Sequence, residues 1–150
     1  MKFRSAAAAA ALAASVAGLA VVGAAPAQAA TKHSSHTTEA LRGYYTSTRW
    51  ASHVVRNYHA GSKKLLTFHV SPNKHGESAG VVTEVFYRGH WVKATVHDPF
   101  WVKLDSRSNG AIDYVGFKAA PYVFRVHVVY NGDRSTKGSV SGWQYFRVTK

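Results

Sequence analysis

The chain of 150 residues contains no cysteine. This absence excludes a scaffold held by disulfide bonds, catalysis by a cysteine nucleophile and a lipid anchor on an N-terminal cysteine. The stability of the folded part must therefore come from the packing of a core. Acidic residues are also scarce, because only seven Asp and Glu stand against 19 Lys and Arg. This scarcity leaves few candidates for glycosidase chemistry, which needs two carboxylates across a cleft.

Motifs of hydrolases and metal sites are missing or incomplete. The run Gly138–Gly142 has Val140 where a nucleophile elbow requires serine. His33 and His36 have the spacing of a chelating pair, but no carboxylate or third ligand accompanies them. The segment Asn131–Arg134 lacks the later acid of a calcium loop. We therefore expect no catalytic centre, no metal and no cofactor.

The long apolar run of the chain lies at its N-terminus. Lys2 and Arg4 precede the apolar segment Ala6–Val22, and Ala27–Ala29 forms a small-x-small cleavage site. These features predict a secretory signal peptide over residues 1–29, and the alternative is a retained transmembrane anchor. The alanine-rich leader ahead of a cysteine-free chain resembles small exported proteins of high-GC Gram-positive bacteria. We therefore expect a secreted, extracellular protein that meets a membrane only through its leader before cleavage.

Basic residues dominate the chain that follows the leader. Without Lys2 and Arg4, 17 basic residues stand against seven acidic ones, which gives a formal charge of +10. Such an excess favours polyanionic partners, among them nucleic acid, cell-wall polymers, acidic polysaccharide and anionic lipid surfaces. The alternative is that the charge only keeps the protein soluble.

After the leader, the chain is long enough for one domain with its own core. Residues 30–50 include the polar run Thr31–Thr38, so we expect a polar or poorly ordered N-terminal segment there. Residues 51–150 show short strand-like runs separated by turn residues. We expect them to form the folded domain, with a first strand at Ser52–Tyr58.

The stretch Pro121–Asp133 has the strongest strand pattern in the chain. One apolar series alternates with a second series that includes Arg125 and His127. This period of two is typical of a strand with one face on a core. Because the second series also contains valines, we place the strand in the middle of a sheet. The residues expected to face the core are Tyr122, Phe124, Val126, Val128 and Tyr130.

Other runs predict further strands. Lys63–Val70 should form one, as should Ala111–Phe117 and Trp143–Thr149, whereas Asn131–Gly142 is rich in Gly and Ser and predicts a flexible loop. In the first of these strands the residues expected to face the core are Leu66, Phe68 and Val70.

The run Val81–Asp98 predicts a hairpin. Its two-residue turn should be Gly89-His90, because a type II′ turn places glycine first. In that register Arg88 lies opposite Trp91, and Thr83 lies opposite Val96. One face of the hairpin would then be consistently suited to a core. The opposite face would carry Glu84, Phe86, Arg88, Trp91, Lys93 and His97.

About seven short strands with turn signals between them predict an all-β fold, an immunoglobulin-like antiparallel β-sandwich. The stretch Phe117–Val126 is similar to the loop and strand at the tyrosine corner of fibronectin type III domains. In those domains an apolar residue, a proline and a tyrosine precede an alternating strand. The resemblance implies a binding module rather than an enzyme.

The outward face of the predicted hairpin carries the candidate binding site. Phe86, Arg88, Trp91 and Lys93 interleave aromatic rings with cations. Such a surface stacks on sugar rings or bases and holds anionic groups. The structural alternative is a cross-strand cation–π pair between Arg88 and Trp91 that needs no ligand. We expect a non-enzymatic binding module for an anionic extracellular polymer, either cell-wall polysaccharide or nucleic acid.

Two other functions stay open. Glu84 and His97 lie on the same predicted face, so a small secreted nuclease could use them as general base and acid. A module that binds another protein is the third alternative. Trp101 and Trp143, each beside a turn, are further candidates for aromatic residues at the rim of a site, although core packing is their expected use.

Overall fold

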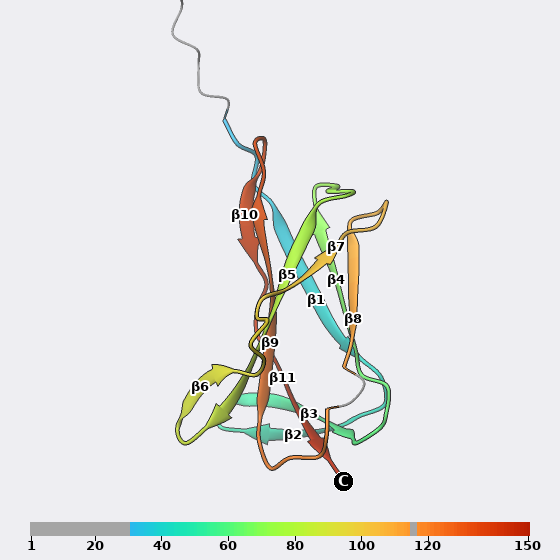
Figure 1. Ribbon diagram of the computed structural model, residues 1–150, viewed down its shortest axis with the longest axis vertical. Helices are drawn as coiled ribbons and strands as arrows, with labels where there is room; N and C mark the ends of the chain where they lie inside the picture. The colour runs from blue at the N-terminus through green and yellow to red at the C-terminus, as the bar shows by residue number, and fades with distance from the viewer. Residues whose placement is uncertain (1–30, 115–116) are drawn as a thin grey trace, which may run out of the picture.

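The structure is a computed structural model that describes residues 31–114 and 117–150, so the predicted signal peptide over residues 1–29 lies outside the described residues. The described part is all-β, without a helix, and has eleven strands instead of the predicted seven or so (Figure 1). No helix in this part is therefore long and apolar enough to cross a membrane. The strands are β1 (His36–Arg42), β2 (Thr46–Trp50), β3 (His53–His59), β4 (Leu65–Ser71), β5 (Ser78–Tyr87), β6 (His90–Lys93), β7 (Phe100–Lys103), β8 (Asn109–Asp113), β9 (Phe124–Gly132), β10 (Lys137–Val140) and β11 (Gln144–Thr149).

The strands form two sheets. The small sheet has the order β1-β4-β8, and the large sheet has the order β2-β3-β11-β9-β5-β6, with β10 paired to β9 and β7 paired to β5. Every pairing between these strands is antiparallel except that of β11 with β3, which is parallel. The predicted all-β class is confirmed, whereas the purely antiparallel arrangement is wrong at this one pair.

One hydrophobic core lies between the two sheets. The predicted inward face of β4 is confirmed, since Leu66, Phe68 and Val70 are buried. The ring of Phe68 lies across Gly110 of β8, so closely that a Cβ atom at that position would overlap the ring. The large sheet adds Ala79, Val81, Val126, Val128, Tyr130, Phe146 and Val148.

The strand β9 occupies the centre of the large sheet, between β5 and β11, as its sequence pattern predicts. Four of the five residues expected to face the core are buried. The exception is Tyr122, which lies before the strand, is 38% exposed and packs edge-on against Tyr87. The prediction that Tyr122 faces the core is wrong because regular pairing begins only at Phe124, which forms a pair with Val85.

The segment 30–50, expected to be polar or poorly ordered, contains β1 and β2. All seven residues of β1 pair with β4, and Thr37 and Leu41 are buried. The sequence pattern failed here because β1 places a threonine and a single leucine in the core, so its polar residues dominate the run. The strand β2 is almost entirely exposed and pairs with β3 along one edge of the sheet.

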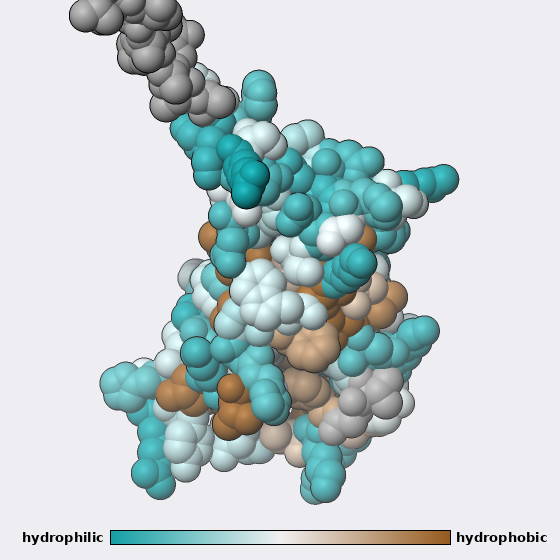
Figure 2. All heavy atoms as spheres, turned by 45° about the horizontal axis from the view of Figure 1, so that its top comes forward, coloured by the Kyte–Doolittle hydropathy of each residue, from teal (hydrophilic) through white to brown (hydrophobic). Residues whose placement is uncertain are grey.

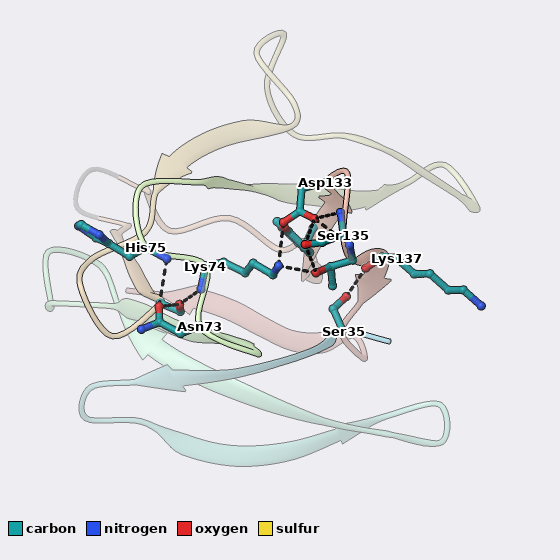
Figure 3. Close-up of polar contacts among 10 residues, drawn as sticks. Ser35, Asn73, Lys74, His75, Asp133, Ser135 and Lys137 are labelled. Atoms are coloured by element: carbon teal, nitrogen blue, oxygen red, sulfur yellow. Dashed lines mark hydrogen bonds and ion pairs between the residues drawn. The ribbon is translucent and has the colours of Figure 1, made fainter. Parts of the chain in front are cut away.

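The segment Asn131–Gly142, predicted to be a flexible loop, contains β10. An ion pair between Lys74 Nζ and Asp133 Oδ2 at 2.7 Å fastens it to the loop after β4 (Figure 3). The same ammonium group donates to the hydroxyl of Thr136, and Tyr130 donates to Asp133 Oδ2 at 3.0 Å. The two contacts of Lys74, which join residues 59 and 62 positions apart in the chain, order a segment whose composition alone indicates flexibility.

Candidate binding surface on the large sheet

The hairpin formed by β5 and β6 has a different register from the predicted one. Phe86 lies opposite Trp91, and Glu84 lies opposite Lys93. The turn consists of Arg88 and Gly89, with φ angles of 49° and 85°, so two left-handed residues form it as in a type I′ turn. The predicted Gly89-His90 turn and the predicted pair of Arg88 with Trp91 are therefore wrong.

The change of register keeps most of the predicted face together. Phe86, Trp91 and Lys93 lie on one face of the hairpin, together with Glu84. Arg88 leaves that face, because it sits in the turn with its guanidinium carbon 5.2 Å from the ring centre of Tyr87. Three of the four residues predicted for the binding site are thus brought together, and one is not.

The second strand of the hairpin is shorter than predicted. The strand β6 ends at Lys93, and after residues 94–99 the chain returns as β7 to pair with the first half of β5. The predicted pair of Thr83 with Val96 is absent, and the carbonyl of Thr83 accepts a hydrogen bond from Ala94 instead. His97 is exposed outside the strand, so the register that placed it beside Glu84 is wrong.

An arginine from the central strand takes the position over Trp91 that was expected for Arg88. The guanidinium carbon of Arg125 in β9 lies 4.2 Å from the ring centre of Trp91 and 4.0 Å from that of Trp143. Because Arg125 faces Glu84 across the β5–β9 pair, it lies on the outward face of the sheet. Two tryptophans therefore enclose one guanidinium on this face.

Further aromatic rings extend this arrangement in both directions along β5. At one end the ring of Trp101 lies over Gly80, where the missing side chain leaves room for it. At the other end Trp50 of β2 packs edge-on against Phe86 and Trp91, with ring centres 4.9 and 5.6 Å apart. We call this surface the aromatic row; its members are Trp50, Phe86, Trp91, Trp101, Arg125 and Trp143.

Histidine and tyrosine rings border the aromatic row. The ring of His127 stacks on Trp143 with centres 3.8 Å apart and planes 7° apart. His53 stacks on Tyr145 at 4.0 Å, and Tyr145 in turn meets Trp91 at 6.0 Å. Contacts through Phe86, Trp91 and Arg125 thus join Trp50 and Trp143, which come from distant parts of the sequence.

The aromatic row carries little net charge of its own. Nε and Nη2 of Arg125 reach Oε2 of Glu84 at 2.7 and 2.6 Å, so the carboxylate neutralises the guanidinium. Burial lowers the pKa of His127, and the charge of Arg125 lowers it further, against an opposing effect of Glu84. This histidine is therefore neutral at pH 7. Lys93 remains an exposed cation at the edge of the row.

Sequence reasoning missed several members of this surface. Arg125 and His127 alternate with the core residues of β9, so the period-two pattern already places them on the outward face. No local pattern indicates that Trp50 reaches the hairpin, because β2 joins the sheet four strands away from β5. Trp101 and Trp143, for which core packing was expected, lie on the outward face, and Trp101 is 47% exposed.

Apolar side chains come to the surface elsewhere as well. Figure 2 shows hydrophilic side chains over the upper part of the molecule and apolar ones across its middle and lower parts.

Among the residues that the structure describes, no group of three or more His, Asp or Glu side chains is placed to hold a metal ion. His33 pairs through its backbone with Thr136, which leaves its imidazole exposed.

Comparisons with protein-family models, with curated proteins and with solved structures find no match for this chain.

Proposed function

We propose that the protein is a secreted, non-enzymatic binding module that stacks the rings of an anionic extracellular polymer on the aromatic row. The polymer is a cell-wall polysaccharide or a nucleic acid, since sugars and bases both offer flat faces to tryptophan. The excess of basic residues over the whole chain supplies a long-range attraction for a polyanion.

The observation that carries this proposal is the gathering of aromatic rings on one outward face of the large sheet. The rings lie over the outward positions of β5 from Gly80 to Phe86, seven residues that span about 20 Å in an extended strand. A surface of that length accommodates several successive units of a polymer. Its tryptophans are partly exposed, in contrast to the closed core on the other face of the sheet.

Stacking and charge should contribute separately to binding. Because Glu84 neutralises Arg125, the row itself offers ring faces more than free charge. Attraction to the polyanion comes from exposed cations around it, such as Lys93 and Arg88. We therefore expect affinity to fall with salt while selectivity among polymers depends on the tryptophans.

The test is retention of the purified protein on cell-wall polysaccharide, single-stranded nucleic acid, neutral glycan and a sulfonate resin, across a salt gradient. Trp101→Ala removes an exposed ring without opening the core. The Trp101→Ala protein should elute earlier than the wild type from the polymer that retains the wild type most strongly. The two proteins should elute together from the sulfonate resin. Lys93→Ala should elute earlier than the wild type from every anionic resin. Lys63→Ala, which removes an exposed cation outside the row, is the matched control for the loss of one charge. Equal elution of Trp101→Ala and wild type on every polymer would refute the stacking proposal.

The nuclease alternative has weaker support. A general base must be free to take a proton, whereas Glu84 is held by Arg125 at 2.6 Å. The expected partner, His97, belongs to the exposed segment between β6 and β7. Cleavage of RNA by the wild type, lost in Glu84→Gln and His97→Ala, would restore that alternative. Retention by a protein ligand that ignores salt would instead indicate a protein-binding module.

The export of the protein and its immunoglobulin-type topology belong to the same proposal. The leader features of residues 1–29 support secretion, and mass spectrometry of protein recovered from culture medium should find Ala30 at the N-terminus.

The central antiparallel strand β9 and the two-sheet arrangement support the immunoglobulin-type topology. An experimental structure with a different strand order would contradict it.

A further inference from the structure

One edge of the large sheet leaves apolar side chains in contact with solvent. The strands β6 and β7 both pair with β5 along this edge, and residues 94–99 connect them (Figure 1). Four of the large apolar side chains that are exposed in the described part of the chain lie between residues 92 and 101; they are Val92, Val96, Phe100 and Trp101. We call residues 92–103 the apolar edge.

The exposed side chains lie on both faces of the apolar edge and at its tip. Phe100 forms a pair with Val81, which is buried in the core, so Phe100 lies on the inward side of the sheet. The ring of Trp101 lies over Gly80 on the outward side. Val96, in the connection between the strands, is 93% exposed. A rigid protein or a polymer would contact one face of such an edge, whereas a fluid lipid surface can surround it on both sides.

The segment that carries Val96 is held by hydrogen bonds at both ends. The backbone N–H of Ala94 donates to the carbonyl of Thr83 at 2.8 Å. The ammonium group of Lys93 donates to the carbonyl of Asp98 at 3.2 Å. The exposure of Val96 is therefore built into the fold. Apolar side chains that a fold gathers and holds in solvent mark a contact surface.

The charges of the apolar edge favour an anionic surface. Lys93 and Lys103 are exposed cations within it, and the imidazole of His97 is exposed between them. Its single acidic residue is Asp98, whose Oδ2 atom is buried. Tryptophan and other apolar side chains beside lysine are typical of proteins that enter the boundary between lipid head groups and acyl chains. Each basic group near anionic head groups adds to the attraction.

We propose that the protein docks on an anionic lipid surface through the apolar edge. Val96 and Phe100 enter the boundary of the acyl chains, Trp101 lies at the level of the head groups, and Lys93 and Lys103 face the phosphates. The sequence predicts contact with a membrane only through the leader, and this docking adds a second contact, made by the folded domain. It does not rest on polymer binding by the aromatic row. Trp101 belongs to both surfaces, so the tests use residues outside the row.

Sedimentation with vesicles measures the docking. Vesicles of phosphatidylcholine are compared with vesicles of an equimolar mixture of phosphatidylcholine and phosphatidylglycerol. The wild type should bind the mixed vesicles at least tenfold more tightly. Val96→Ser and Phe100→Ser should each weaken that binding by at least about threefold. Val140→Ser, which changes an exposed valine of β10, is the matched control and should change it less than twofold. Lys103→Ala should weaken it more than Lys63→Ala does, since both lysines are exposed but only Lys103 belongs to the apolar edge.

A label at a single site reports insertion directly. Because the chain has no cysteine, Val96→Cys offers one thiol for a dye whose fluorescence rises in apolar surroundings. Val140→Cys carries the same dye as the control. Mixed vesicles should raise the fluorescence at position 96 and leave that at position 140 unchanged.

Contrary outcomes overturn the proposal and identify what replaces it. Equal vesicle binding by Val96→Ser and Val140→Ser, or vesicle binding without a signal at position 96, would show adsorption by charge alone. A signal at position 96 with nucleic acid or cell-wall polysaccharide, and none with vesicles, would assign the apolar edge to the polymer. A signal that depends only on protein concentration would make it a contact between copies of the chain.

Discussion

The stability of the outward face should depend on Arg125 more than on any cation of the predicted hairpin. Its guanidinium lies between Trp91 and Trp143 at 4.2 and 4.0 Å and is paired with Glu84. The two side chains of the ion pair are only 20% and 21% exposed, so water screens them less than an ordinary surface pair. Arg125→Ala removes all these contacts at once.

The expected loss can be estimated from its parts. Each cation–π contact contributes about 0.5–2 kcal/mol, and a hydrogen bond to a charged group contributes about 1.5–3 kcal/mol. The two tryptophans can partly close the gap, so we expect Arg125→Ala to lower the free energy of unfolding by about 3 kcal/mol. Arg125→Lys keeps the charge but loses the flat guanidinium, and about half of that loss should remain.

Equilibrium unfolding in urea, followed by far-UV circular dichroism, measures this loss without relying on tryptophan fluorescence. Arg134→Ala removes an exposed arginine and should stay within about 0.5 kcal/mol of the wild type. In a double-mutant cycle, Arg125→Ala combined with Glu84→Gln should cost less than the two single changes added together. A loss below about 1 kcal/mol for Arg125→Ala would refute the estimate and the idea that Arg125 holds this face together.

Three further predictions test other parts of the fold. Gly110→Ala forces a Cβ atom into the ring of Phe68 and should lower the free energy of unfolding in urea by at least about 1–3 kcal/mol. Gly142→Ala, at a position with open space, should lower it little. Equal losses in the two variants would contradict this packing. The hydrogen bond from Lys74 holds the pKa of Asp133 below its usual range. The stability that the Asp133 carboxylate adds is therefore complete above about pH 4 and is lost as the pH falls. The difference in free energy of unfolding between the wild type and Asp133→Asn should shrink in acid, and a constant difference would contradict this prediction. Burial lowers the pKa of His127. The stability that this side chain adds to the fold is therefore complete above about pH 6.5 and declines below it. Unfolding of His127→Gln should therefore depend less on pH between about 5 and 7.5 than that of the wild type, and an equal dependence would exclude His127 as the cause.

The parts of the fold that sequence predicted best have one inward and one outward face. In β4 and β9 the alternation of apolar residues identifies the core side correctly, because burial of one face fixes which residues can point inward. The central place of β9 followed from valines on both of its faces. A short edge strand such as β2 offers no such pattern, since it is exposed along most of its length.

Long-range polar contacts account for the segments that sequence reasoning left unordered. The fastening of β10 depends on Lys74 and Asp133, which are 59 residues apart in the chain. Nothing in the local sequence of either residue indicates the other. Composition therefore predicts flexibility for Asn131–Gly142, although the ion pair orders it.

The hairpin shows why a face can be predicted more reliably than a contact. The observed register is shifted by two residues from the predicted one. Because side chains alternate between the faces of a sheet, each residue keeps its side while its partner changes. Phe86 and Trp91 consequently remain on the outward face even though the predicted pairing was wrong. Arg88 loses its predicted place on that face, because the observed register moves it into the turn. The cation over Trp91 comes from β9 instead, since the Glu84–Arg125 pair places a guanidinium where the hairpin no longer does.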